Sequence, residues 1–403
     1  MSTSLLYPTF GIVGYEHLGT HYEKGSTIFQ IRRNRFQIRC SHCRSNRFIF
    51  RGKTLRRFRT IPIGSRPTFI EMEIPRIMCL ACDTVRQVPI FFAETRRTFT
   101  KVFERYVIEL SRCMTLFDIA KHLKVSWGMI KDILKRHLSK VFSNPGLKNI
   151  SWIAIDEISI GKGHRYLTVV LNLKTGRVIF VGEGKGSDAL KPFWERVKQA
   201  KSKIKAVAID MSPAYISAVM DNLPKAVIVF DHFHVVKYFN DKLSEFRRAL
   251  YHQMDNIFEK RILKGTRWLL LKNPENLKDD KNETKRLNEA LELNKPLATV
   301  YYLKEELRQF WSQLDKAAAE QYIQQWIRTA QASKIPMLQK FSKTIAWHKF
   351  GILNYYDHPI STGPLEGTNN KIKTLQKQAY GFRDHEFFKL KIYSLHQAKY
   401  ALV

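Results

Sequence analysis

The spacing of hydrophobic residues changes along the chain and divides it into three kinds of structure. Between residues 98 and 138 apolar positions recur every three or four residues, which indicates helices. From residue 151 short β-branched runs predict strands, with helices at 188–200 and from Ser212. The predicted strands cover residues 152–160, 166–173, 178–182, 204–209 and 226–230. Helical spacing returns at about residue 235, and we interpret the block that follows as a helical insertion.

The order of these elements, β-β-β-α-β-α-β, is that of the ribonuclease-H-like fold, in which the first and fourth strands are neighbours. Here the first strand contains Asp156 and the fourth ends at Asp210. A carboxylate in an apolar strand is costly unless it is paired or binds a cation. One such residue is better explained as a turn cap or a lysine partner, but two favour a site for a hard divalent metal ion. Glu157 should face the other side of its strand, because side chains alternate there.

A third acid follows the insertion. Glu366 lies in the segment G-P-L-E-G-T-N-N-K-I-K, where Pro364 favours the first turn of a helix. An acid that complements the helix dipole is the alternative interpretation. Against it, Glu366 is the only acid between Asp357 and Asp384, in a cationic segment. The same helix carries candidate DNA-binding residues at Asn370, Lys371 and Lys373.

The charge balance of the chain predicts a polyanionic partner. The 403 residues include 68 Lys and Arg against 36 Asp and Glu, for a net charge of +32. Nucleic acid is favoured over a membrane surface, because the chain has no apolar run of roughly 18 residues and no amino-terminal signal pattern. We therefore expect a soluble, cytoplasmic protein that binds DNA and has no membrane partner.

The cysteines indicate a structural zinc site near the amino terminus. Two C-x-x-C pairs, Cys40 with Cys43 and Cys79 with Cys82, can close a tetrahedral four-thiolate site. The gap of 35 residues between them exceeds the ~15–20 of the simplest ribbon, but strand-like runs in the gap can form its hairpin. A histidine ligand, His42 or His21, is an alternative. The fifth cysteine, Cys113, lies in a helical stretch and is expected in the core.

The first knuckle stands in a run of eleven basic residues without an acid, from Arg32 to Arg59. A solvated charged face is the ordinary explanation, but so many uncompensated cations favour phosphate binding, with Arg56 and Arg57 as candidates.

Further along, the sequence predicts a helix, a tight turn and a second helix, in the segments T-L-F-D-I-A-K-H-L, K-V-S and W-G-M-I-K-D-I-L-K-R-H-L. An ordinary helical hairpin is possible, but the basic surroundings favour a DNA-binding helix-turn-helix. Its expected groove contacts are Ser126, Trp127 and Lys131, and Lys131, Lys135 and Arg136 are expected to be exposed.

Three tryptophans of the insertion have separate interpretations. Trp311 and Trp326 are expected in its core. Trp268 stands beside Lys264 and Arg267, so it is a candidate for stacking on an unpaired base.

Taken together, these motifs resemble bacterial insertion-sequence transposases of the D-D-E type, of the L-three family. The resemblance extends from about Cys40 to Phe388 and is most specific in V-F-D-H-F-H-V-V-K and G-P-L-E-G-T-N-N-K-I-K. It implies an α+β multidomain fold: a zinc ribbon, a helix-turn-helix and a ribonuclease-H-like α/β catalytic domain interrupted by an α-helical insertion. The expected boundaries are 28–95 for the ribbon, 98–145 for the helix-turn-helix, 150–234 and 356–403 for the catalytic domain, and 235–355 for the insertion.

The resemblance also implies the chemistry. Asp156, Asp210 and Glu366 would be the catalytic triad and would hold two Mg²⁺ or Mn²⁺ ions, beside one structural Zn²⁺ in the ribbon. Asp231 and His234 would form a D-x-x-H element next to the site, where His234 either approaches the scissile phosphate or is a hydrogen-bonded structural residue. A homodimer would bind terminal inverted repeats and target DNA in the bacterial nucleoid. A domesticated DNA-binding regulator and a structure-specific metal-dependent nuclease are the alternatives.

Overall fold

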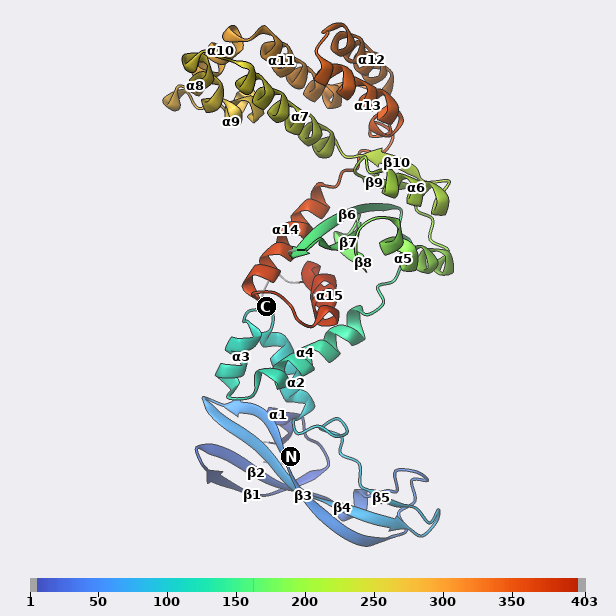
Figure 1. Cartoon of the computed structure of the whole chain (residues 1–403). Helices are drawn as coiled ribbons and strands as arrows, with labels where there is room; N and C mark the ends of the chain where they lie inside the picture. Colours follow the sequence, from blue (N-terminus) through green and yellow to red (C-terminus); the bar gives the residue numbers. More distant parts are fainter. Residues whose placement is uncertain (1–5, 162, 398–403) are drawn as a thin grey trace. The chain divides into compact units, whose positions relative to one another are not determined.

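The fold is described from a computed structural model that covers residues 6–161 and 163–397 (Figure 1). The chain divides into two compact units, which are taken separately below. The first unit contains residues 1–143 together with 377–403, and the second contains residues 144–376.

The amino-terminal part of the first unit is a five-stranded sheet. Its strands run in the order β1-β2-β4-β3, with β5 paired to β4. The elements are α1 (Leu6–Phe10), β1 (Tyr15–Glu23), β2 (Ser26–Arg33), β3 (Phe48–Ile63), β4 (Arg66–Cys79) and β5 (Val85–Gln87). The long hairpin of β3 and β4 is the one that the sequence predicted between the two cysteine pairs. The sheet also includes residues before the predicted start at 28, because β1 pairs with β2.

Three helices follow: α2 (Lys101–Leu110), α3 (Leu116–Leu123) and α4 (Trp127–Phe142). Thr115 and Ser126 cap α3 and α4 through their side chains, and Lys124 ends α3 in the left-handed region with φ 52°. The small residue Ala120 is buried with Ile119 and Ile130, as expected for the tight packing of a helix-turn-helix. This arrangement matches the helix, turn and helix that the sequence predicted.

Two expectations for this unit are wrong. Cys113 is exposed, in the turn after α2, because the helix ends at Leu110. Lys131, Lys135 and Arg136 are half-buried, because α15 (His385–Ser394) packs on α4. Residues from 377 group with the amino-terminal unit, and the expected catalytic segment 356–403 stays a prediction.

The second unit is built on a five-stranded sheet in the order β10-β9-β6-β7-β8. Its elements are β6 (Trp152–Gly161), β7 (Arg165–Asn172), β8 (Arg177–Glu183), α5 (Ser187–Ala200), β9 (Ala206–Ile209), α6 (Pro213–Asn222) and β10 (Val227–Phe230). β6, β7 and β8 are antiparallel, whereas β6, β9 and β10 are parallel. This confirms the predicted β-β-β-α-β-α-β order of a ribonuclease-H-like sheet.

The helical insertion leaves the sheet after β10 and returns through α13. Its helices are α7 (His232–Gln253), α8 (Ile257–Gly265), α9 (Arg267–Leu271), α10 (Glu283–Leu293), α11 (Lys295–Gln309), α12 (Lys316–Ala332) and α13 (Pro336–Leu353). The insertion shares one hydrophobic core with the sheet. Trp326 is buried there as predicted, with its indole N–H donated to the carbonyl of Leu303. Trp311 packs against the same core and is partly buried.

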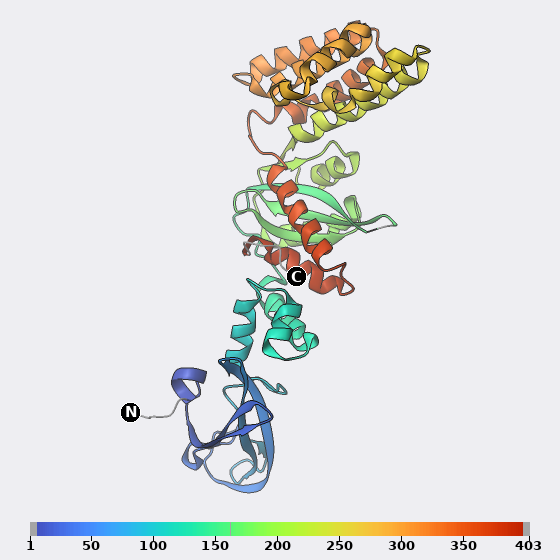
Figure 2. The ribbon, with the colours of Figure 1, turned by 90° about the vertical axis from the view of Figure 1, so that its left-hand side faces the viewer.

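Two contacts fix the insertion and the helix that follows it against the sheet. A Cβ on Gly351 of α13 would lie 2.4 Å from the ring of Phe230, so only glycine allows this approach to β10. The following helix, α14 (Gly363–Gln378), runs along β6 on the face opposite α5 (Figures 1 and 2). Near its end the side-chain amide of Gln376 donates to the carbonyl of Ile160.

Candidate active site and metal centre

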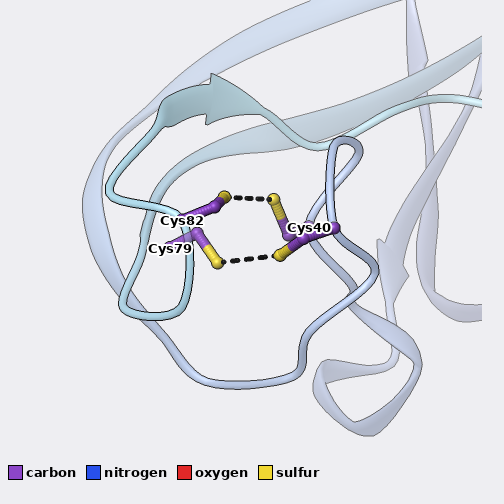
Figure 3. Close-up of side chains that lie close together, drawn as sticks. Cys40, Cys79 and Cys82 are labelled. Atoms are coloured by element: carbon purple, nitrogen blue, oxygen red, sulfur yellow. Dashed lines mark hydrogen bonds between the residues drawn. The ribbon is translucent and has the colours of Figure 1, made fainter.

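The four cysteines of the two knuckles form a compact cluster, as predicted. Their sulfur atoms all lie within 4.8 Å of one another, and the closest pairs are Cys43 with Cys79 at 3.4 Å and Cys40 with Cys82 at 3.8 Å. Figure 3 shows the sulfurs of Cys79 and Cys82 turned toward the knuckle that carries Cys40. Four thiols at such distances fit a tetrahedral zinc site with no open position, which is a structural site.

The surroundings of the cysteines favour the thiolate at Cys40 but not at Cys43, whose pKa is raised to about 12. Backbone N–H groups of Cys43 and His42 lower the pKa of the Cys40 thiol to about 6, which favours the thiolate that zinc requires. The β-sheet register places Phe48 of β3 opposite Cys79 of β4, so the hairpin holds the two knuckles together. His42 and His21 are not part of the cluster. The four-cysteine interpretation is therefore the one that the geometry supports.

The parallel pairing of β6 and β9 brings the first two acids together. Ala154 of β6 is the register partner of Ala208 of β9. Asp156 and Asp210 stand two residues further along these neighbouring strands, so their carboxylates come from adjacent positions at the same end of the sheet. The Asp210 charge helps to raise the pKa of Asp156, which agrees with this proximity.

Asp156 occupies a half-buried site with specific partners. Burial is the main reason that its pKa rises from 3.8 to about 6, while the charge of His234 acts in the opposite direction. One carboxylate oxygen accepts the Glu157 N–H at 2.8 Å, and the other accepts the side-chain amide of Asn369 at 2.9 Å. Glu157 itself lies near Tyr215 of α6, so the two neighbouring carboxylates have different surroundings, as strand alternation predicts.

The third acid is near this pair but is not joined to it. Glu366 lies in the first turn of α14 and is exposed. Asn369, one turn later, is buried and contacts Asp156, and side chains three residues apart on a helix are about 5–6 Å apart at Cβ. Within the part of the chain that the structure describes, the four cysteines are the group whose ligand atoms come within metal-binding range. The three acids do not form so compact a group.

Asp231 anchors the start of α14. It is 1% exposed, and its carboxylate accepts the hydroxyl of Thr362 at 2.7 Å and the Thr362 N–H at 3.3 Å. Because Asp231 directly follows β10 and Thr362 directly precedes α14, this pair ties the helix of Glu366 to the sheet. The two ends of the D-x-x-H element therefore have different surroundings: Asp231 binds the loop before α14, and His234 lines a cleft.

A cleft of about 400 Å³ opens beside Asp210. It is lined by Asp210, Met211, Ser212, His234, Lys237, Tyr238, Asp241, Thr344 and His348. Ser212 donates its N–H to Asp210 at 3.0 Å, which turns the chain into α6. The side chains therefore combine carboxylates with a lysine and two histidines, a mixture suited to a metal-bound phosphate.

The predicted DNA contacts have different surroundings in the structure. Arg57 is paired with Glu23 at 3.0 Å and Glu71 at 2.8 Å, and Arg56 donates to the carbonyl of Arg97. The basic run is thus partly neutralised by acids that lie outside it. Lys131 is paired with Asp384 at 2.9 Å. Burial alone would raise the pKa of Asp384, but hydrogen bonds from Lys131 and Lys135 hold it well below its usual range.

Other predicted contacts are accessible. The Trp127 side chain is about half exposed at the start of α4, and the Ser126 hydroxyl accepts the Met129 N–H as the helix cap. Asn370, Lys371 and Lys373 lie on the exposed face of α14. Trp268 is exposed, with the Arg267 guanidinium 4.6 Å from its ring centre.

Sequence reasoning missed several residues that shape the site, namely Asn369 as the partner of Asp156, Thr362 as the partner of Asp231, and His348 in the cleft. The Asn-Asn pair after Glu366 was a signal for the first of these. The other two depend on tertiary contacts.

Among the described residues, no helix has the length and apolar character to cross a bilayer.

Comparison with known proteins agrees with this architecture. A family model described as "Transposase" matches residues 153–392, the helix-turn-helix model of transposase family ISL3 matches 86–138, and the zinc-finger model of transposases IS204/IS1001/IS1096/IS1165 matches 37–82. The transposase of insertion sequence IS1001 from Bordetella parapertussis is 33% identical over 88% of this chain and 87% of its own length. The transposase of IS1557 from Mycobacterium tuberculosis strain H37Rv is 29% identical over 86% of this chain and 82% of its own length.

A solved structure, the Drosophila P element transposase strand transfer complex, has a TM-score of 0.42 and 10% identity, and covers 77% of this chain and 94% of that one. That likeness is too low to bear on the assignment. The zinc ribbon, helix-turn-helix and acid-bearing sheet, in this order, define a transposase with DNA-binding and DDE catalytic domains. Within that class, the chain belongs to the ISL3 family.

Proposed function

We propose that this transposase binds the terminal inverted repeats of a mobile DNA element and uses Asp156, Asp210 and Glu366 to hold two Mg²⁺ or Mn²⁺ ions for cleavage and strand transfer. The observation that carries the proposal is the pairing of β6 with β9, which sets Asp156 beside Asp210, with α14 bonded to Asp156 through Asn369. The donor set fits such ions, because all three residues supply hard carboxylate oxygens. The desolvated Asp156 and its like-charged neighbour are both stabilised by a cation.

When bound, the two ions would supply Lewis acidity to the attacking and leaving oxygens of the scissile phosphate. The residues of the chain do the positioning. Asn369 orients the Asp156 carboxylate, and Asp231 fixes the loop from which α14 starts. His234 and Lys237 line the cleft, where both can contact the phosphate of a DNA strand. Glu366 is exposed, and its carboxylate would complete the site by turning toward Asp156.

DNA recognition is assigned to several surfaces. Ser126 and Trp127 stand at the start of α4, where a recognition helix meets base edges. Lys131 joins them only after a phosphate displaces Asp384, which is a salt-sensitive exchange. Asn370, Lys371 and Lys373 extend the contact along α14, and Arg56 contributes from the ribbon. We further propose a homodimer acting at the two element ends in the bacterial nucleoid.

The test uses the two terminal repeats of the element that carries the gene. Asp156→Asn, Asp210→Asn and Glu366→Gln should each abolish metal-dependent cleavage, by on the order of 10³-fold or more, because each removes a charged metal ligand. Binding of the repeats, measured by gel shift, should be largely retained. Glu157→Gln is the matched control and should cleave normally. Metal-dependent nicking that persists in purified Asp156→Asn contradicts the assignment, and joining of pre-cleaved ends to a plasmid distinguishes strand transfer from hydrolysis.

A further inference from the structure

An exposed tryptophan of the insertion stands next to the cleft and has no role in the site described so far. Trp347 of α13 is 80% exposed, although it belongs to the residue type that is most often buried in large part. Its helix turns Phe341 and Ile345 into the core, so the indole projects from the opposite side. Four fifths of the Trp347 surface is therefore left uncovered by the chain and is available to a partner.

The neighbours of Trp347 connect it to the candidate active site. Thr344, three residues earlier, and His348, the next residue, both line the cleft that contains Asp210 and His234. Residues three positions apart on a helix share a face. Trp347 does not line the cleft itself, but it lies on α13 beside these two residues that do.

Two lysines lie on the same stripe of the helix. Lys340 and Lys343 are seven and four residues before Trp347, and both are exposed. Neither forms an ion pair with an acid among residues 6–161 and 163–397, in contrast to Lys349, which is bonded to Glu320 at 2.8 Å. An exposed aromatic ring flanked by unpaired cations matches the chemistry of single-stranded nucleic acid, whose bases stack while its phosphates bind lysine.

Trp268 offers a comparison, because it is also exposed. Its helix, α9, directly follows α8, and Arg247 of α7 donates to the carbonyl of Leu263 in α8. His234 and Arg247 lie about 20 Å apart along α7 at ~1.5 Å per residue. The Trp268 ring is also already covered on one face by Arg267. Trp347 is therefore better placed to meet nucleotides at the cleft.

We propose that Trp347 stacks on an unpaired base of the DNA strand at the mouth of the cleft, and that Lys340 and Lys343 bind the phosphates beside it. This subsite rests on the proposed function, because it uses the same cleft. It gives the protein a means of holding a DNA end in which base pairs next to the cleavage position are opened. Stacking at this point would orient the scissile phosphate toward Asp210 and His234.

The test compares two probes with the full-length, zinc-loaded protein in buffer without Mg²⁺, so that no cleavage occurs. One probe is a blunt duplex, and the other is the same duplex with a short unpaired tail. Wild type should prefer the tailed probe. Trp347→Ala should lose that preference, with binding of the tail weakened by about 5- to 150-fold, the range expected for the loss of one base stack. Its affinity for the blunt duplex should be unchanged.

Three controls keep the result specific. Trp347→Phe retains a ring and should keep most of the tail preference, whereas Trp268→Ala should leave the preference intact. Lys340→Ala with Lys343→Ala should weaken both probes and reduce the salt dependence of binding by about two phosphate contacts. The proposal is overturned if Trp347→Ala preserves the tail preference, weakens both probes equally, or changes the oligomeric state in size-exclusion chromatography. Failure of the proposed function would be a separate result, namely metal-dependent cleavage that persists in Asp156→Asn.

Discussion

The zinc ribbon and the acidic site are both clusters of potential metal ligands, but the fold completes only one of them. The four cysteine sulfurs lie within 4.8 Å of one another and belong to two turns joined by a single hairpin. The acids come from β6, from the end of β9 and from α14, and the contact that links α14 to Asp156 spans 213 residues. Asp156 and Asp210 are adjacent, whereas Glu366 is exposed.

Physical chemistry explains this difference. Neutral thiols can gather without a metal, and backbone N–H groups already favour the thiolate of Cys40. Carboxylates are charged at neutral pH, so bringing three together without a cation costs both desolvation and repulsion. The ribbon is therefore expected to be a permanent structural site. The acidic site is expected to close when metal and DNA bind, and this would limit cleavage to the assembled complex.

The largest expected effect is on the ribbon. Cys79→Ser should abolish zinc binding, because structural zinc contributes about 10–16 kcal/mol in small zinc-binding domains and serine is a poor substitute for thiolate. Element-end binding should fall with it. Elemental analysis of the purified variant measures the metal directly. Cys113→Ser is the matched control, since Cys113 is exposed outside the cluster, and normal zinc content in Cys79→Ser would contradict a four-cysteine site.

The cost of burying Asp156 without a metal should appear in the pH dependence of stability. Because folding raises its pKa from 3.8 to about 6, the folded state binds the proton more tightly than the unfolded chain. This group therefore destabilises the Mg²⁺-free protein progressively as pH rises from about 4 to about 6, by at most ~3 kcal/mol above that window.

Asp156→Asn should accordingly be more stable than wild type at neutral pH, and the gain should vanish near the lower end of the window. Thermal unfolding in buffer without added Mg²⁺, with zinc retained, measures this difference. Added Mg²⁺ should raise the melting temperature of wild type and not that of the variant. An equal response to pH in both proteins would show that the burial of Asp156 carries no such cost.

A smaller effect is expected for the residue that joins the two halves of the acidic site. Asn369→Ala removes the hydrogen bond to Asp156, and the loss of such a supporting contact typically costs 10–100-fold in metal affinity or activity. The Mg²⁺ concentration needed for half-maximal cleavage should rise, which a purely structural role would not cause. Thr374→Ala, on the exposed face of the same helix, should change neither quantity. An unaltered Mg²⁺ requirement in Asn369→Ala would remove the residue from the site.

The sequence predicted those features that depend on local pattern. Strand order followed from β-branched runs, and the position of Asp156 and Asp210 followed from where those runs place an acid. The zinc cluster followed from two C-x-x-C pairs. In each case the signal lies within a few neighbouring residues, and the fold adds only the pairing of adjacent strands.

What the sequence did not predict depends on contacts between distant segments. Lys131 and Lys135 were expected to be exposed, but they meet Asp384 on a segment that returns from the carboxyl-terminal part of the chain. The same is true of Thr362, whose bond to Asp231 positions α14. The role proposed for Trp347 likewise depends on the cleft that other residues of its helix line. Periodicity shows which face of a helix is apolar, but not which distant element covers the other face.

The most direct test of the account is a titration of the zinc-loaded protein with Mn²⁺, followed by electron paramagnetic resonance or calorimetry. Wild type should bind Mn²⁺, and Asp156→Asn and Asp210→Asn should each weaken binding by about tenfold or more, because each removes a charged oxygen ligand. Glu366→Gln should weaken Mn²⁺ binding relative to wild type when DNA is present. Glu157→Gln should bind Mn²⁺ as wild type does. Mn²⁺ binding that is undiminished in both Asp156→Asn and Asp210→Asn would contradict the claim that these carboxylates form the catalytic metal site.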